Sequence, residues 1–221
     1  MGDGFRLLVH GGAGGRPGTR PDPAQEEALH RALREALEAG GRVLASAGAA
    51  LDAVVAAVAA LEDAPELNAG RGSVLTSDGR VQMDACVMDG ASGRAGAVAA
   101  VEGLAHPVEA ARRVLEAGAH VLLAGPDARA FALAHGVAPA APAALVTPTR
   151  RRQLEAARAR GRLALDHDAA GAPGPDGEEG GGTVGAVALD ARGRLAAATS
   201  TGGVTNQLPG RVGDSPVPGA G

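Results

Sequence analysis

The feature that most constrains the fold is a strand pattern that begins abruptly after a glycine-dense, acidic run. Residues 171–182 are rich in Gly, Pro, Asp and Glu, a composition typical of a flexible linker. Residues 183–190, which follow directly, form the clearest strand pattern in the chain. A strong strand that starts at Thr183, with a flexible linker and no helix or strand directly before it, makes the boundary between residues 182 and 183 the feature to be explained.

A hairpin is predicted from the turn that follows this strand. Asp190 and Arg194 flank the loop Ala191-Arg192-Gly193, which has glycine where a left-handed residue is usual. If Asp190 pairs with Arg194, Thr183 lies opposite Thr201. The two threonine side chains would then share one face of the sheet, with Cβ atoms about 5 Å apart.

Thr183 is a candidate nucleophile if the chain is cut before it. A threonine hydroxyl is a weak nucleophile, but a free α-amino group with a pKa of about 8 can act as its base. The glycines at 180–182 would let the preceding peptide bend toward the hydroxyl. These residues taken alone favour an ordinary strand start. The match of residues 180–185 to G-x-G-x-x-G follows a linker and opens a strand, which excludes a dinucleotide site.

The rest of the chain predicts an α+β fold, because strands and helices do not alternate regularly. The run 136–182 is rich in Ala, Pro and Gly and predicts a flexible linker with one Arg-rich helical stretch. The expected strands are 5–10, 73–76, 81–88, 95–101 and 120–123, with Asp78-Gly79 at a hairpin tip between the second and third. The expected helices are 23–39, ended by Gly40 and Gly41, then 49–62, 107–117, 128–135 and 150–162.

Composition excludes several classes of function. The net charge is −4 and the chain has no Lys, so neither a nucleic-acid surface nor lysine chemistry is expected. Phe5 and Phe131 are the only aromatic residues apart from histidine, which argues against base-stacking surfaces. Cys86 is alone and is expected in the core. With no basic leader and no long apolar run, we expect a soluble, cytoplasmic protein without a membrane partner.

Arg211 and Asp214 are three residues apart in a glycine-flanked turn. A guanidinium and a carboxylate on one loop match the α-carboxylate and α-ammonium groups of an amino acid. The same pair also fits a solvated surface ion pair, which the residues alone favour.

Five sequence blocks together resemble the plant-type L-asparaginase / isoaspartyl peptidase family of N-terminal nucleophile hydrolases. The blocks are His10-Gly-Gly-Ala-Gly14, Leu67-Asn-Ala-Gly-Arg-Gly-Ser73, Met83-Asp-Ala-Cys-Val-Met-Asp-Gly90, Gly182-Thr-Val-Gly185, and Thr199-Ser-Thr-Gly-Gly203 continuing through Pro216. The resemblance implies a four-layer αββα sandwich. It also implies self-cleavage between Gly182 and Thr183. Residues 1–182 would form an α subunit, and residues 183–221 would be the first part of a β subunit.

The same resemblance implies roles for individual residues. Thr183 would be nucleophile and base, with Thr201 hydrogen-bonded to it. Arg211 would hold the substrate carboxylate and Asp214 its amine, and Asn68 would face the site. His10 and the glycines after it would line the site, where a structural role of His10 is favoured over that of a catalytic base. No catalytic cofactor is implied. A structural sodium ion would be held by backbone oxygens of Leu61, Glu62, Ala64, Leu67, Ala69 and Arg71.

The implied activity is hydrolysis of L-asparagine and β-aspartyl dipeptides with release of L-aspartate, by a dimer of associated αβ units. One departure is that the family continues with a Thr-Gly pair that serves the oxyanion hole, whereas this sequence stops at Gly221. Loss of an oxyanion donor costs about 10²–10³ in rate. We therefore expect a β subunit that lacks its C-terminal part, and an inactive, unprocessed homologue with a structural or binding role is an alternative. A glycosylasparaginase-like amidase is a second alternative, against which the single cysteine argues.

Overall fold

The structure, a computed structural model, describes residues 4–12, 22–160 and 182–221. These residues form strands β1 (Arg6–His10), β2 (Met83–Asp89), β3 (Arg94–Val101), β4 (Leu122–Ala124), β5 (Val184–Leu189) and β6 (Leu195–Thr201). The helices are α1 (Pro23–Ala45), α2 (Ala50–Asp63), α3 (Pro107–Ala117), α4 (Gly125–Ala134), α5 (Pro142–Leu145) and α6 (Pro148–Ala159).

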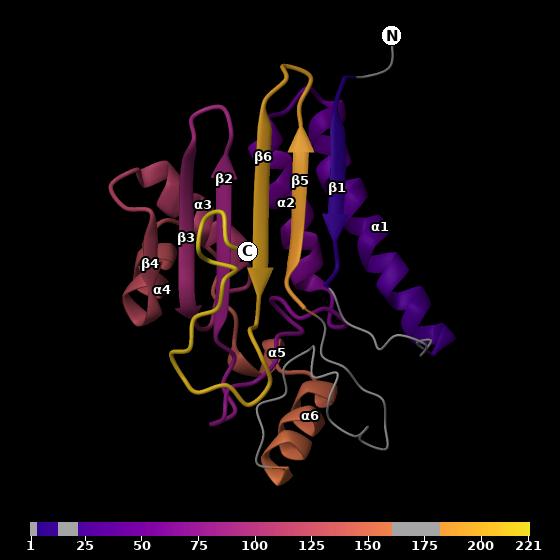
Figure 1. Cartoon of the computed structure of the whole chain (residues 1–221), viewed down its shortest axis with the longest axis vertical. Coiled ribbons are helices and arrows are strands. Elements are labelled where there is room, and N and C mark those ends of the chain that lie inside the picture. Colours follow the sequence, from indigo (N-terminus) through magenta and orange to yellow (C-terminus); the bar gives the residue numbers. More distant parts are fainter. Residues whose placement is uncertain (1–3, 13–21, 161–181) are drawn as a thin grey trace.

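The strands form one six-stranded sheet in the order β1-β5-β6-β2-β3-β4. All neighbouring pairs are antiparallel except β3 and β4, which are parallel. Helices α1, α2 and α3 lie on one face of the sheet (Figure 1). The predicted α+β class is confirmed, and the described residues form a sheet layer and a helical layer.

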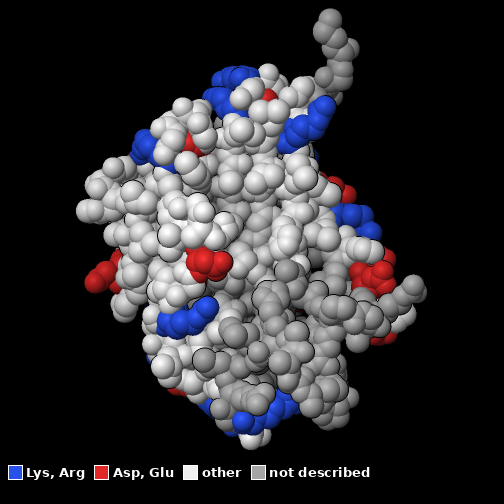
Figure 2. All heavy atoms as spheres, viewed as in Figure 1, with Lys and Arg blue, Asp and Glu red and all other residues white. Residues whose placement is uncertain are grey.

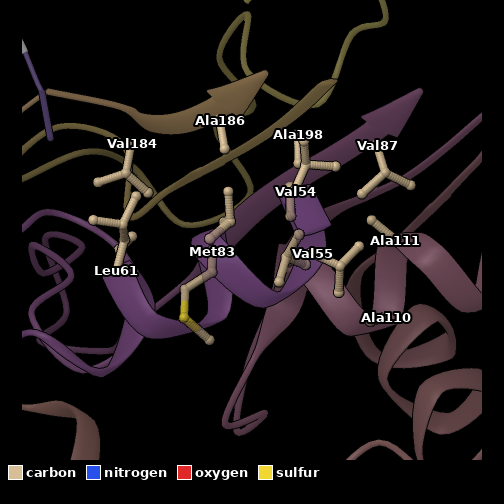
Figure 3. Close-up of a cluster of buried hydrophobic side chains, with 14 of the residues drawn as sticks. Val54, Val55, Leu61, Met83, Val87, Ala110, Ala111, Val184, Ala186 and Ala198 are labelled. Carbon is tan, nitrogen blue, oxygen red and sulfur yellow. The ribbon is translucent and has the colours of Figure 1, made fainter. Parts of the chain in front are cut away.

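The core lies between the sheet and this helical layer. Val184 of β5 and Ala198 of β6 point toward helix α2, where Leu61 and Val54 meet them, and Val87 of β2 points toward helix α3 (Figure 3). All five side chains are almost completely removed from solvent. Burial of such apolar surface contributes about 25 cal/mol per Å², so this contact holds the two layers together.

The opposite face of the sheet exposes apolar side chains. Leu8 is 63% exposed, Val187 48% and Leu195 59%. Leu8 pairs with Val187 across β1 and β5, and Leu195 lies on β6 two residues from the partner of Val187. Over these strands the surface is largely uncharged, and most of the charged side chains in this view lie around its rim (Figure 2). The C-terminal segment crosses the same face in front of β2 and β6 (Figure 1).

The hairpin predicted around Asp190 is confirmed, including its register. Val184 pairs with Ser200, and the pairing continues without a shift to the last pair of the ladder, Leu189 with Leu195. The Asp190 N–H donates to the Arg194 carbonyl oxygen (2.9 Å), and Gly193 has a φ of 76°. The same register extended by one residue places Thr183 opposite Thr201.

The predicted end of the first helix was wrong, because α1 continues through Gly40 and Gly41 to Ala45. A Cβ atom at Gly40 would lie 2.8 Å from the carbonyl oxygen of Ala53 and 2.8 Å from Leu7 Cδ2. Gly40 therefore lets α1 approach α2 and β1 closely. The contact between these elements outweighs the poor helix propensity of glycine.

The hairpin predicted between 73–76 and 81–88 was also wrong. A turn does form at Gly79, whose N–H donates to the Thr76 carbonyl oxygen (2.9 Å). However, Thr76 makes an isolated bridge with Gln207, and β2 starts only at Met83 and pairs with β3 and β6. The Thr76 N–H still donates to the Arg80 carbonyl oxygen across the turn (2.9 Å), but beyond it long-range partners replace the local pairing.

Part of the segment predicted as a linker, 136–182, contributes to the core. The Arg-rich helical stretch forms α6, and Leu145, Leu154 and Arg150 are buried. The Arg150 Nε donates to the Gly72 carbonyl oxygen (2.5 Å), which ties α6 to the loop after α2. The remaining linker residues, 161–181, lie outside the described residues.

Asp190 joins the β5–β6 hairpin to helix α2. Its carboxylate accepts hydrogen bonds from the Arg192, Arg194 and Ala50 N–H groups and from the Arg194 guanidinium. Burial by itself would raise the pKa of Asp190, but these donors outweigh it and hold the pKa at about 2. Because Ala50 is the first residue of α2, the carboxylate also caps this helix.

Replacing the two adjacent glycines of α1 is expected to have opposite effects. Gly40→Ala should destabilise the protein by about 1–3 kcal/mol, because its Cβ atom overlaps the α2 backbone. Gly41→Ala is the matched control, since a Cβ atom there meets nothing within 4 Å. It should be stabilising by about 0.5–1 kcal/mol. Urea unfolding of both variants measures this, and equal effects would contradict the packing role of Gly40.

The pKa of Asp190 predicts a pH-dependent contribution to stability. A carboxyl group whose pKa falls from 3.8 to about 2 on folding stabilises the protein fully above about pH 4. This stabilisation is lost as the pH falls toward 2. Asp190→Asn should therefore be less stable than the wild type at pH 7, and the difference should shrink between pH 4 and pH 2. A difference in urea midpoint that stays constant over this range would contradict the assignment.

Candidate active site

The candidate site residues gather at one end of the sheet. Thr183 precedes β5, Thr201 ends β6, and His10 ends β1, and these strands are neighbours. Because neighbouring strands run antiparallel, the end of one lies beside the start of the next. The sheet topology therefore brings together residues that are far apart in the sequence.

Thr183 is half-buried and its hydroxyl has a side-chain partner that the sequence analysis did not single out. Thr183 Oγ1 lies 2.7 Å from Ser215 Oγ, and either atom can donate the hydrogen bond. Thr201 Oγ1 instead accepts a hydrogen bond from the Gly203 N–H (3.1 Å). In the described part of the chain, no hydrogen bond joins the two threonine hydroxyls.

The peptide bond before Thr183 lies against the loop that follows β1. His10 Nδ1 is 3.1 Å from the Thr183 carbonyl oxygen and 3.1 Å from the Gly12 backbone nitrogen. A Cβ atom at Gly12 would lie 2.8 Å from the nitrogen and 2.9 Å from the oxygen of Gly182. Gly12 also has a φ of 111°, so only glycine fits this close approach.

Asn68 is fully buried and fixes the turn after β6. Its side-chain amide donates to the Gly203 carbonyl oxygen (2.8 Å), its side-chain oxygen accepts the Val74 N–H, and its backbone oxygen accepts the Gly202 N–H. A Cβ atom at Gly202 would lie 2.6 Å from the Asn68 side-chain oxygen. Asn68 thus positions the turn directly after Thr201.

Arg211 and Asp214 lie on the C-terminal segment without pairing with each other. Arg211 Nη1 donates to Gln207 Oε1 (3.2 Å), Asp214 is exposed, and the described residues give no ion pair between these two. Gln207 itself is buried and its amide oxygen also accepts the Val204 N–H. The guanidinium and the carboxylate therefore remain available to opposite charges.

Three side chains of the sheet region hold this segment in place. Gln82 Oε1 accepts the Gly210 N–H (2.7 Å), Asp84 Oδ2 accepts the Gly213 N–H (3.3 Å), and Thr199 Oγ1 donates to the Ser215 carbonyl oxygen (2.9 Å). Sequence reasoning did not assign roles to these residues. A carboxylate at position 84, within the run of β2 whose other buried residues are apolar, is the signal that could have indicated one.

Asp84 is buried, and burial raises its pKa above the ordinary value. Its second oxygen accepts the Ala100 N–H (2.7 Å), where Ala100 has a φ of 50° beside an irregularity in the β2–β3 pairing. The two N–H donors and the charge of Arg211 partly offset the effect of burial, whereas the charge of Asp214 adds to it. Asp84 thus links the centre of the sheet to the segment that carries Arg211.

The loop proposed to hold sodium presents some of its backbone oxygens to one point. A Cβ atom at Gly72 would lie 2.2 Å from the Leu67 oxygen, 2.8 Å from that of Pro65 and 3.0 Å from that of Ala64. Converging carbonyl oxygens suit a monovalent cation, although the Ala64 oxygen also accepts the Leu67 N–H (3.2 Å). The Glu62 oxygen instead accepts the Arg71 N–H (2.8 Å).

Other features of the described residues limit the chemistry. They contain no cluster of His, Cys, Asp and Glu side chains suited to hold a metal ion. Burial raises the pKa of the Cys86 thiol to about 11, so it stays protonated at neutral pH, as expected for a core residue. Among these residues, no helix is both long enough and apolar enough to cross a membrane.

Comparison with known proteins identifies similar sequences over almost the whole chain. A family model described as "Asparaginase" matches residues 4–221. The chain is 52% identical to an isoaspartyl peptidase of Salmonella typhimurium, over 97% of this chain and 68% of the relative. It is 49% identical to the isoaspartyl peptidase of Escherichia coli and 45% identical to an isoaspartyl peptidase/L-asparaginase of Homo sapiens, over 97% of this chain and 66% of each relative. The chain thus spans about two thirds of the length of these curated relatives.

Hydrogen exchange of the backbone amides of Gly213 and Ala100 should report whether the Asp84 carboxylate accepts hydrogen bonds from them. Asp84→Asn replaces one acceptor oxygen with an NH₂ group, which cannot accept a hydrogen bond. At least one of the two amides should then exchange about tenfold faster or more, because a hydrogen bond to a carboxylate is lost. Asp89→Asn, at the other end of β2, is the control. Unchanged exchange at both amides in Asp84→Asn would show that the carboxylate does not hold the segment.

Proposed function

Because the chain belongs to the type 2 asparaginase family, we propose that it is a threonine-nucleophile amidohydrolase acting on L-asparagine and β-aspartyl dipeptides. The chain would cleave itself between Gly182 and Thr183 before it acts. The observation that carries this proposal is the position of Thr183, directly before β5 and in contact with the segment that bears Arg211 and Asp214. The names of the relatives, isoaspartyl peptidase and isoaspartyl peptidase/L-asparaginase, support the substrate class.

Self-cleavage would start with attack of Thr183 Oγ1 on the carbonyl carbon of Gly182. A C–O bond forms, the C–N bond to Thr183 breaks, and the hydroxyl proton goes to the departing nitrogen. Water then hydrolyses the resulting ester, which leaves a carboxylate on Gly182 and a free amine and hydroxyl on Thr183. The close packing of Gly12 against Gly182 supports this step, because it limits how the peptide bond before Thr183 can lie.

In the cleaved protein, the new α-amine of Thr183 would take the proton from its own hydroxyl. The hydroxyl attacks the side-chain amide carbon of the substrate, and the amine passes the proton to the leaving ammonia or peptide amine. Water hydrolyses the aspartyl ester, which releases L-aspartate and restores the hydroxyl. Thr201, opposite Thr183, would lie on the same side of the sheet as this reaction.

Substrate recognition would use the charges on the C-terminal segment. The Arg211 guanidinium would bind the α-carboxylate and the Asp214 carboxylate the α-ammonium group, since each lacks an ion-pair partner among the described residues. Asn68 would act by fixing residues 202–203, against which it is buried.

The exposed apolar face supports a larger assembly of layers. Leu8, Val187 and Leu195 form a surface that a second sheet could cover, and a helical layer outside that sheet would complete the four-layer αββα sandwich. About one third of each relative lies outside its match to this chain. We further propose that residues 1–182 and 183–221 stay associated after cleavage, in a cytoplasmic dimer of αβ units. A sodium ion at Ala64 and Leu67 would stabilise the loop that carries Asn68, without a part in catalysis.

Intact mass spectrometry tests self-cleavage directly. On incubation the chain should separate into two masses that correspond to 1–182 and 183–221, because the Thr183 hydroxyl attacks the preceding carbonyl. Thr183→Ala should remain one mass, whereas Thr205→Ala, which removes a buried threonine hydroxyl elsewhere, should still be cut.

Activity on β-aspartyl dipeptides and L-asparagine, followed as release of aspartate, should increase in parallel with the cut fraction. A wild-type chain that keeps a single mass over days would refute the proposal. Cleavage without consumption of either substrate would support the nucleophile but refute the substrate class for this chain.

A further inference from the structure

Ser215 is the side chain that contacts the hydroxyl of Thr183. It is 2% exposed, and its Oγ lies 2.7 Å from Thr183 Oγ1. Among the described residues, Ser215 is the hydrogen-bonding partner recorded for this hydroxyl. No role was assigned to Ser215 from the sequence, although it directly follows Asp214.

The backbone of Ser215 is held from the sheet side. The Thr199 hydroxyl donates to the Ser215 carbonyl oxygen (2.9 Å), and Asp84 accepts the Gly213 N–H two residues earlier (3.3 Å). Thr199 lies in the middle of the sheet, paired with Gly185 on one side and Cys86 on the other. The backbone that carries the Ser215 hydroxyl therefore cannot move away from Thr183 unless these contacts break.

The uncut chain has a particular need for such a contact. Before cleavage, the nitrogen of Thr183 belongs to a peptide bond and cannot act as the base that orients the hydroxyl. A threonine side chain can take more than one staggered rotamer. A fixed hydrogen-bonding partner on a neighbouring segment favours the rotamer that places Oγ1 beside it.

We propose that Ser215 is a positioning residue for Thr183, which sets the direction of the nucleophilic hydroxyl. The inference rests on the proposed function. Ser215 forms and breaks no covalent bond, and it keeps its own proton after the reaction. Because Asp214 and Ser215 are adjacent, the segment that would bind the substrate amine also orients the nucleophile. Docking of this segment on the sheet would then be required for self-cleavage as well as for substrate binding.

The test compares the self-cleavage rates of the full chain and three variants at position 215. Ser215→Ala should slow the appearance of the 183–221 fragment about tenfold, the effect of one lost hydrogen bond. Ser215→Thr keeps the hydroxyl and should restore most of the rate. Ser215→Cys keeps a side chain of similar size, but its thiol forms only weak hydrogen bonds, so its cleavage rate should match that of Ser215→Ala. This variant tests the positioning role of Ser215 if the alanine variant does not fold. Ser200→Ala, which removes another buried serine hydroxyl, should cleave like the wild type.

A second measurement separates this inference from the proposed function. Three-bond couplings of the methyl group of Thr183, in threonine-labelled protein, report its rotamer whether or not the chain is cut. They should change in Ser215→Ala and Ser215→Cys but not in Ser200→Ala. If the wild type cleaves and Ser215→Ala cleaves within twofold of its rate, the inference fails while the proposed function stands. If the wild type never cleaves, the proposed function fails, and unchanged couplings in Ser215→Ala would overturn the positioning contact as well.

Discussion

The insertion of β5 between β1 and β6 is the constraint on which the rest of the structure depends. β5 pairs with β6 along its whole length and with β1 from Gly185 to Leu189, and its inward side chains Val184, Ala186 and Ala188 are buried. A strand held on both edges and on one face has little freedom to shift. Thr183, the residue before it, is therefore placed by the sheet rather than by the linker. A cut before Thr183 would leave all of these contacts intact, which is why the two fragments would remain together.

The same topology explains how a site forms from distant segments. β1 ends where β5 begins, β5 begins where β6 ends, and β2 begins beside the end of β6. His10, Thr183, Thr201 and Asp84 therefore come to one end of the sheet. The segment after β6 then needs only to fold back over this end to bring Ser215 to Thr183. Asp84 and Thr199 stabilise that return, since each gives the segment a hydrogen bond from inside the sheet.

Local rules predicted some of this arrangement and long-range contacts decided the rest. The register of β5 and β6 follows from Asp190 and Gly193, because a three-residue loop with a left-handed glycine fixes which residues pair. No local rule links Ser215 to Thr183, 32 residues earlier. The predicted hairpin at Gly79 failed for the same reason, since Gln207 takes the partner position at Thr76. The roles inferred from the family resemblance for Arg211 and Asp214 remain predictions. The hydrogen bond that the resemblance implies between Thr201 and Thr183 is not formed among the described residues, because Thr201 Oγ1 accepts the Gly203 N–H and Thr183 Oγ1 contacts Ser215.

The near absence of aromatic residues corresponds to close packing of the helices on the sheet. The inner faces of β5 and β6 carry mainly alanine, and Gly40 of α1 has no side chain where it lies against Ala53 of α2. Small residues on facing surfaces let the helices approach the sheet closely. The start of α2 then lies near enough to the β5–β6 turn for Asp190 to accept the Ala50 N–H (3.2 Å). One carboxylate thereby closes the hairpin and caps the helix beneath it. A bulky aromatic residue at position 186 or 198 would separate these layers, and the loss would extend through the hairpin to the position of Thr183.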